Sequence, residues 1–171
     1  VYAVGPARHS ASASWSLPAA TGRPGAARHI LKSKAMLKKV EVYTTLVTTG
    51  ENGNDEIRTT SQGGCLMQDG DIMLRYPEPD NHGMAHLLIT TGLADLKRQG
   101  DVRSRLTFIE GQMLPCHYVT SAGALNLDIF THSLSLVLTD AGGCFEARYT
   151  VLVGGAHATD NELKVEFTFT E

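Results

Sequence analysis

Cysteine is scarce in this sequence of 171 residues, which contains only Cys65, Cys116 and Cys144. The number is odd and no Cys-x-x-Cys pair occurs, so neither a disulfide framework nor a cysteine-rich zinc site is expected. Long apolar runs are also missing. No stretch approaches the roughly 18 residues of a membrane-spanning helix, and no secretory signal pattern is present. These absences predict a cytoplasmic protein with no membrane partner.

Aromatic residues and surplus basic charge are low as well. Phe, Trp and Tyr make up 6% of the sequence, and its formal charge is −3. A platform for base stacking and a basic surface for phosphates are therefore not expected, which argues against a nucleic-acid partner. The sequence has no Gly-x-x-x-x-Gly-Lys-Ser/Thr loop, no Gly-x-Gly-x-x-Gly between a strand and a helix, and no Gly-x-Ser-x-Gly elbow. We predict no cofactor.

Charge is distributed unevenly along the chain. Residues 1–35 contain five basic and no acidic residues, whereas 36–171 contain 10 basic and 18 acidic residues and carry a charge of −8. The first segment is rich in small residues and lacks apolar alternation, so we expect it to be disordered. It fits a transit peptide, a sparse basic arm, or an upstream extension foreign to the domain. The start-like sequence Met36-Leu37-Lys38-Lys39 favours the last, which leaves 36–171 as the folded domain.

Apolar and polar residues alternate over most of the chain from residue 36 onward. In the first such run Val40 and Val42 share one face, while Glu41 and Tyr43 share the other. A period of two is typical of a strand with one buried face. The pattern recurs in six further runs, at 72–76, 105–108, 125–129, 133–138, 145–153 and 162–169.

Turn residues separate these runs, most of them about 8–12 residues apart. The turns are Asn52-Gly53, Asp69-Gly70, Asn81-His82-Gly83, Gln99-Gly100-Asp101, Glu110-Gly111, Ala122-Gly123, Gly142-Gly143 and Gly154-Gly155. One longer interval predicts a bend near His132-Ser133, and Gly63-Gly64 is interpreted as a turn or bulge. The segment 87–99 is interrupted by Thr and Gly, so it fits two strands better than a helix.

Sequential hairpins of this kind favour an antiparallel meander. Closing it into an up-and-down barrel removes the exposed edges, and neither a Greek-key crossover nor a Cys–Trp–Cys signature favours a sandwich. We predict an all-β fold with about 8–10 strands in a closed barrel.

The order of these motifs resembles that of a known family. Lys97-Arg98-Gln99-Gly100 is followed by Leu106-Thr107-Phe108, then by Tyr118-x-Thr120-x-x-Gly123, Tyr149 and Asn161-x-Leu163. This succession over roughly 38–169 resembles the YwiB-like family of small bacterial proteins, although Ser121-Ala122 departs from the bulky residue or Pro usual before that glycine. The resemblance implies a calycin-like (lipocalin-like) β-barrel in a bacterial cytoplasm, and it implies no activity.

Arginines in or beside the strands are the strongest candidates for ligand contacts. Arg105 and Arg148 are opposite in phase to Leu106 and Tyr149. If the apolar faces line the interior, these arginines are surface charges, which we favour. If the exterior is partly apolar, they point inward and can bind a carboxylate or phosphate. The candidate ligand-binding residues are Tyr76, Arg98, Arg105, Tyr118, Thr120 and Arg148.

Metal-binding and catalytic patterns are weak. His82 and His86 are four residues apart, a spacing suited to a helix, whereas these residues lie in a turn and a strand. The pairs Glu162/Glu166 and Asp69/Asp71 fit solvated positions, and Cys116 and Cys144 fit packed small side chains. We therefore predict no metal site and no catalytic residues. A small-molecule binding module is our first hypothesis, a structural or interaction barrel with a packed core the second, and an enzyme the third.

Overall fold

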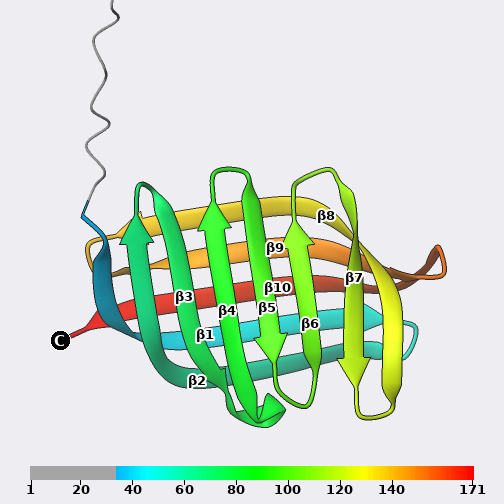
Figure 1. Ribbon diagram of the computed structural model, residues 1–171. Helices are drawn as coiled ribbons and strands as arrows, with labels where there is room; N and C mark the ends of the chain where they lie inside the picture. The colour runs from blue at the N-terminus through cyan, green and yellow to red at the C-terminus, as the bar shows by residue number, and fades with distance from the viewer. Residues whose placement is uncertain (1–33) are drawn as a thin grey trace, which may run out of the picture. The chain divides into compact units, whose positions relative to one another are not determined.

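The computed structural model describes residues 34–171, which form a closed antiparallel barrel of ten strands (Figure 1). The strands are β1 (Met36–Gly50), β2 (Gly53–Gln68), β3 (Asp71–Glu78), β4 (Gly83–Thr90), β5 (Leu93–Gln99), β6 (Arg103–Phe108), β7 (Met113–Thr120), β8 (Gly123–Thr139), β9 (Gly142–Val153) and β10 (Ala156–Thr170). The predicted up-and-down barrel is confirmed, and its strand count is consistent with a calycin-like barrel. The prediction of a disordered segment over 1–35 falls, except for 34–35, outside the described residues.

Each strand pairs with the next along the chain, and β1 closes the ring by pairing with β10. The two predicted strands within 87–99 are confirmed as the end of β4 and most of β5. Among the described residues the only helix is one 3-10 turn, η1 (Pro79–Asn81), between β3 and β4. No helix within 34–171 is long and apolar enough to cross a membrane.

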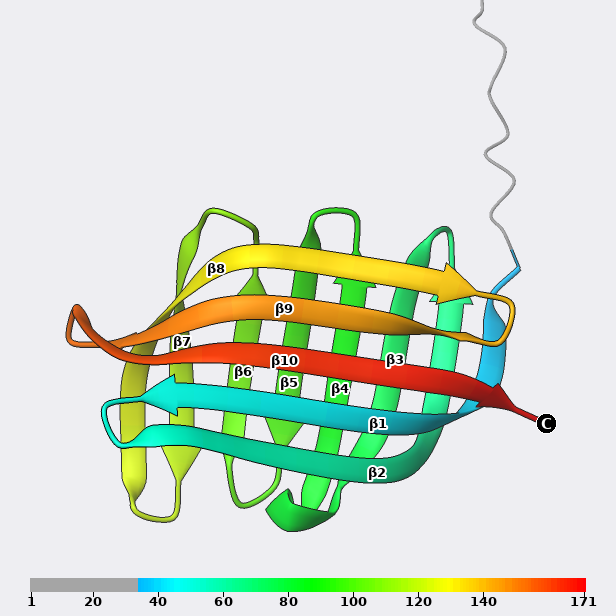
Figure 2. The same ribbon diagram turned by 180° about the vertical axis from the view of Figure 1, so that it is seen from behind.

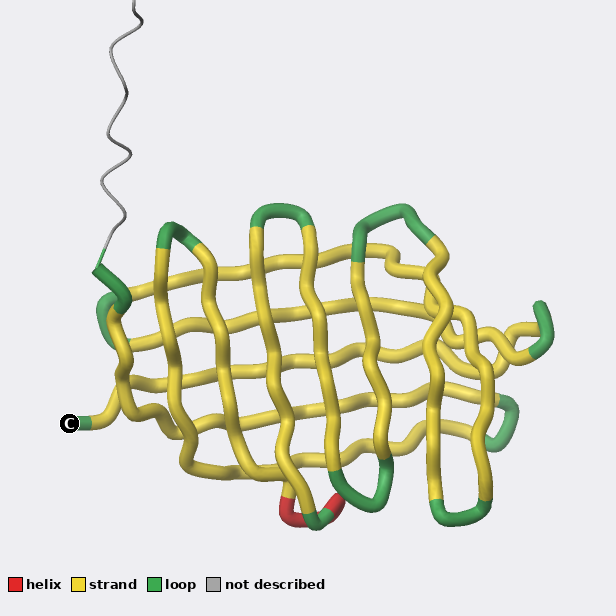
Figure 3. The backbone as a smooth tube through the Cα atoms, viewed as in Figure 1, coloured by secondary structure: helices red, strands yellow, loops and turns green. Residues whose placement is uncertain are grey.

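The ring is flattened into two layers whose strands cross steeply (Figures 1 and 2). The shorter strands β3–β7 form one layer, and the longer strands β8, β9, β10, β1 and β2 form the other. The backbone trace shows that both layers consist almost entirely of strand (Figure 3). The bend predicted near His132-Ser133 is a register shift between Thr131 and Ser133. Runs 125–129 and 133–138 therefore belong to one bulged strand, β8.

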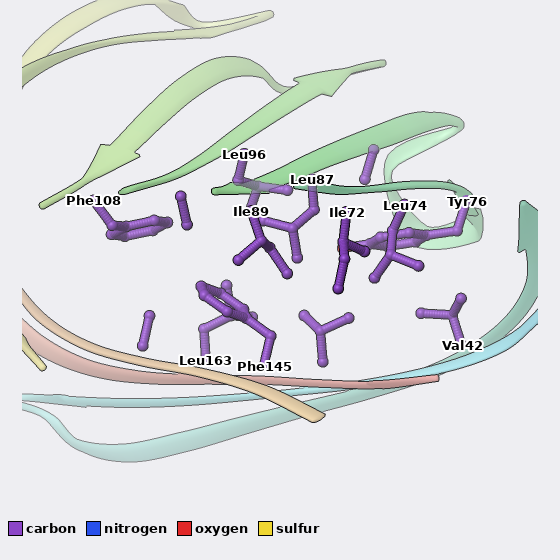
Figure 4. Packing of buried hydrophobic residues seen from close by; sticks show 14 of the residues in the cluster. Val42, Ile72, Leu74, Tyr76, Leu87, Ile89, Leu96, Phe108, Phe145 and Leu163 are labelled. Carbon is purple, nitrogen blue, oxygen red and sulfur yellow. The ribbon is translucent and has the colours of Figure 1, made fainter. Parts of the chain in front are cut away.

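Side chains of alternate residues fill the space between the layers (Figure 4). The core contains Val42 of β1, Leu74 of β3, Leu87 of β4 and Phe145 of β9, all almost fully buried. The rings of Phe108 on β6 and Tyr149 on β9 have centroids 5.0 Å apart. The apolar faces of the predicted runs thus line the interior over most of their length, although Leu125, Leu138 and Val153 at the ends of their runs are exposed.

The interpretation of Gly63-Gly64 as a turn or bulge is wrong, because both residues lie inside β2 in unbroken register with β1. A Cβ atom on Gly63 would lie 2.3 Å from the Arg75 carbonyl oxygen of β3, whereas one on Gly64 would meet nothing closer than 3.9 Å. Gly63 is needed where the backbones of β2 and β3 converge.

This difference between adjacent glycines is testable. We expect Gly63→Ala to lower the free energy of unfolding by about 1–3 kcal/mol, because an inserted methyl group forces the strands apart. Gly64→Ala is the matched control and should change it by less than about 1 kcal/mol. Chemical denaturation of both variants measures the effect. Equal changes would contradict the close approach.

Candidate functional site

A cavity of about 280 Å³ lies inside one end of the barrel. It lies between the adjoining ends of β3, β5 and β6 in one layer and β1, β2, β9 and β10 in the other. Its apolar lining consists of Leu46, Ile57, Leu96, Val102, Leu106 and Leu163. Its polar lining consists of Thr44, Thr59, Tyr76, Glu78, Asp80, Asn81, Arg98 and Tyr149. The cavity lining therefore combines apolar and polar side chains, as sites for small molecules do.

An ion pair between Arg98 and Glu78 lies among the polar residues that line the cavity. Nε of Arg98 donates to both carboxylate oxygens of Glu78, at 2.9 and 3.1 Å. The two side chains are only 26% and 18% exposed. Arg98 points inward because it has the strand phase of Leu96, and Glu78 points inward because it has the phase of Tyr76. Pairing offsets the desolvation of both charges, which neither could tolerate alone.

The Nη groups of Arg98, a cavity-lining residue, are unused by the ion pair. Both of its hydrogen bonds within residues 34–171 use Nε, and its two Nη groups have none. Each Nη group carries two N–H donors, and the planar edge they form matches a carboxylate or phosphate in two parallel hydrogen bonds. Arg98 is thus fixed by Glu78 on one side and faces the cavity with unused donors.

Asn81 holds two loops together at this end of the barrel. Its Nδ2 donates to Glu78 Oε2 at 2.9 Å and to the Val102 carbonyl at 3.0 Å, and its Oδ1 accepts from the Val102 N–H at 2.6 Å. The approach is so close that a Cβ on Gly100 would lie 2.1 Å from the Asn81 carbonyl oxygen. The η1 turn and the β5–β6 loop therefore form a rigid rim around the ion pair.

Two buried tyrosines, Tyr76 and Tyr149, are the remaining large polar residues of the cavity lining. Burial raises the pKa of the Tyr149 phenol to about 12, and the nearby Arg98 charge opposes this rise. Burial, reinforced by the Glu78 charge, also raises the pKa of Tyr76 well above its ordinary value. Both phenols stay protonated at neutral pH, so each can donate a hydrogen bond in the cavity.

The structure brings Tyr76 and Arg98 together at the cavity, but not the other predicted residues. Arg105 lies on the outer surface, 71% exposed, and its Nη2 is 2.5 Å from Asp95 Oδ2. Arg148 is also outside, 66% exposed and paired with Glu162. These positions agree with the favoured interpretation of Arg105 and Arg148 as surface charges.

Two further candidate ligand-binding residues, Tyr118 and Thr120, lie on β7 and do not line the cavity. Tyr118 is half-buried. The hydroxyl of Thr120 accepts from the Ala122 N–H and donates to the Gly123 carbonyl, both at 3.2 Å, which closes the β7–β8 turn. Glu78, Asn81 and Tyr149 were not identified as site residues from the sequence. Glu78 could have been identified, because it is two residues from Tyr76 and therefore faces the same side of its strand.

The five histidines within residues 34–171 are dispersed over the barrel. His82 Nδ1 lies 2.5 Å from Asp101 Oδ2 on the exposed rim, and this hydrogen bond raises the pKa of His82. No group of three His, Cys, Asp or Glu residues among those described is placed to hold a metal ion.

One histidine contacts a threonine hydroxyl on the outer surface. Thr150 Oγ1 donates to Asp160 at 2.6 Å and lies 2.7 Å from His132 Nε2. Since the single hydroxyl proton is directed at Asp160, His132 must donate to Thr150. His132 is therefore not placed to accept the proton of Thr150 as a base.

The fold and its internal cavity define a small β-barrel with a polar-lined pocket, and the sequence assigns it to a family. The chain belongs to the family described as Domain of unknown function (DUF1934), whose profile matches residues 40–165. The crystal structure of the ywiB protein from Bacillus subtilis is similar, with a TM-score of 0.70 at 18% sequence identity. The match covers 79% of this chain and 94% of that one. The resemblance to the YwiB-like family is thus confirmed, and this likeness shows the fold alone. A comparison with curated proteins gave no match.

The raised pKa of Tyr149 predicts a loss of stability at high pH. The unfolded chain releases the phenolic proton near pH 10, whereas the folded protein keeps it until about pH 12. The stabilisation is therefore complete below pH 10 and lost as the pH rises to 12, about 2–3 kcal/mol in all. Denaturation at several pH values should show a smaller loss for Tyr149→Phe than for wild type. Tyr118→Phe, at a half-buried tyrosine outside the cavity lining, is the control, and an unchanged slope in Tyr149→Phe would contradict the assignment.

Proposed function

We propose that the protein is a non-enzymatic binding module that holds a small amphipathic anion in the cavity beside Arg98. The observation that carries this proposal is the partly buried guanidinium of a cavity-lining residue, whose Nη donors have no hydrogen-bond partner within the described residues. An unused charged donor in a partly buried site favours an oxyanion of matching geometry.

The lining supports an apolar body for the ligand. Leucine side chains from β1, β5, β6 and β10 line the cavity together with the polar groups. A volume of about 280 Å³ lies at the lower end of the roughly 300–1,000 Å³ typical of small-molecule sites. Asp80 adds a negative charge, but it is exposed at the rim, where water screens it. A short-chain carboxylate is therefore the ligand class that fits best.

The proposed setting is the cytoplasm, and the proposed fold relationship is to the calycin-like barrels. All three cysteines are free, and Cys65 and Cys116 are buried among core side chains. Burial raises the pKa of both thiols, which keeps them protonated and unreactive. Free, packed thiols fit a reducing compartment.

Three probes of equal chain length test the head group. Octanoate, octanol and octylamine share the apolar body and differ in charge, and isothermal titration calorimetry compares their affinities. We expect octanoate to bind most tightly. Tightest binding by octylamine would contradict an anionic ligand, and no binding by any probe would favour a barrel that acts only through its surface.

Substitutions then locate the contact. Arg98→Met should weaken octanoate binding by roughly tenfold or more, because it removes charge-assisted hydrogen bonds, and should leave octanol within about twofold. Since Arg98→Met leaves Glu78 unpaired, the double variant Glu78→Gln/Arg98→Met separates lost binding from lost folding. Arg105→Met and Arg148→Met are matched controls from the outer surface. Loss of octanoate binding in either control, with Arg98→Met unaffected, would overturn the assignment.

A further inference from the structure

A row of basic side chains crosses the outer face of the short-strand layer. Arg75 on β3 is opposite His86 on β4, His86 is opposite Lys97 on β5, and Lys97 is opposite Arg105 on β6. These four residues, the basic ladder, all have the outward strand phase, and Arg75, Lys97 and Arg105 are exposed. The strands lie side by side (Figure 1), so neighbouring positions are about 4.8 Å apart.

The ladder is unusual because its charges are largely unpaired. Within residues 34–171, Arg105 alone among the four has an acidic partner, Asp95. On the long-strand layer, by contrast, Arg58, Arg148 and Lys164 each pair with a glutamate. Like charges on directly opposed strand positions destabilise a sheet. In a domain of charge −8, a row that holds two unpaired cations, Arg75 and Lys97, indicates a surface complementary to an acidic partner.

An apolar row runs beside the ladder. Leu37 on β1 is opposite Leu66 on β2, Leu66 is opposite Met73 on β3, and Met73 is opposite Leu88 on β4. Met73 and Leu88 are each two residues from a ladder residue on the same strand, about 6.7 Å away. Leu37 is 77% exposed and Met73 41% exposed. The face therefore offers an apolar stripe and a cationic stripe in parallel.

We propose that this face docks an acidic amphipathic helix of a partner protein. A helix lying across the strands rises about 5.4 Å per turn, close to the strand spacing, so one acidic residue per turn can meet each ladder position. Its apolar stripe then covers Met73 and Leu88, the helix-on-surface mode of recognition.

Other occupants fit the face less well. No Phe, Tyr or Trp faces outward from β3–β6, which lie wholly within the described residues, so a single nucleic-acid strand has no stacking platform. Duplex nucleic acid offers no apolar surface for Met73 and Leu88. A second copy of the chain that presented acidic residues from another part of its surface would form an open-ended, head-to-tail contact. Residues 1–35 are basic and cannot complement the ladder.

The test uses a labelled synthetic helix with glutamate on one stripe and leucine on the adjacent one. Fluorescence anisotropy with the full chain should show binding that weakens as salt is raised. Arg75→Gln/Lys97→Gln should weaken binding by roughly fivefold or more, as expected for two exposed ion pairs. The matched control Arg58→Gln/Lys164→Gln removes the same charge from the other layer and should stay within about twofold.

Four outcomes would overturn the proposal. These are no binding of the glutamate helix, equal binding of a glutamine analogue, equal loss in the control double variant, and tighter ladder-dependent binding to duplex DNA or to phosphatidylglycerol vesicles. Octanoate binding in the cavity is measured on the opposite side of the sheet, so either proposal can fail alone.

Discussion

The pairing of β1 with β10 is the interaction on which the rest of the structure depends. β1 is hydrogen-bonded to β2 along 36–50 and to β10 along 39–50, and these pairings close the ring of strands. Closure turns the alternation of each strand into a strict division between inside and outside. Whether a side chain meets the core, the cavity or solvent then follows from its position within its strand.

Strand phase explains why chemically identical residues have different roles. Arg98 shares its phase with Ala94 and Leu96, so it lies inside, where its charge requires the carboxylate of Glu78. Arg105 and Arg148 have the opposite phase, and their ion pairs lie in water, where such pairs contribute little. The polar site is at one end of the barrel because only there can an ion pair keep some contact with solvent.

Much of this fold could be predicted from the sequence, because strand alternation and turn chemistry are local. The strands, the hairpins and the bend at His132 all follow from residues within a few positions of one another. Gly63 was misjudged because the Arg75 carbonyl that requires it belongs to another strand. The cavity was also beyond sequence reasoning: Glu78 and Arg98 are 20 residues apart and meet only through the registers of β3, β4 and β5. The phase of Arg98, however, was readable from Ala94 and Leu96.

The register of β5 links the inner and outer faces of the short-strand layer. Inside, Arg98 is opposite Ser104 of β6 and Ala85 of β4; outside, Lys97 is opposite Arg105 and His86. A slip of one residue would exchange these rows, turning Arg98 outward and leaving Glu78 inside without its partner. The buried pair of Arg98 and Glu78 therefore opposes such a slip, and so keeps the basic ladder on the outside. The same ion pair that shapes the cavity thus helps to maintain the surface behind it.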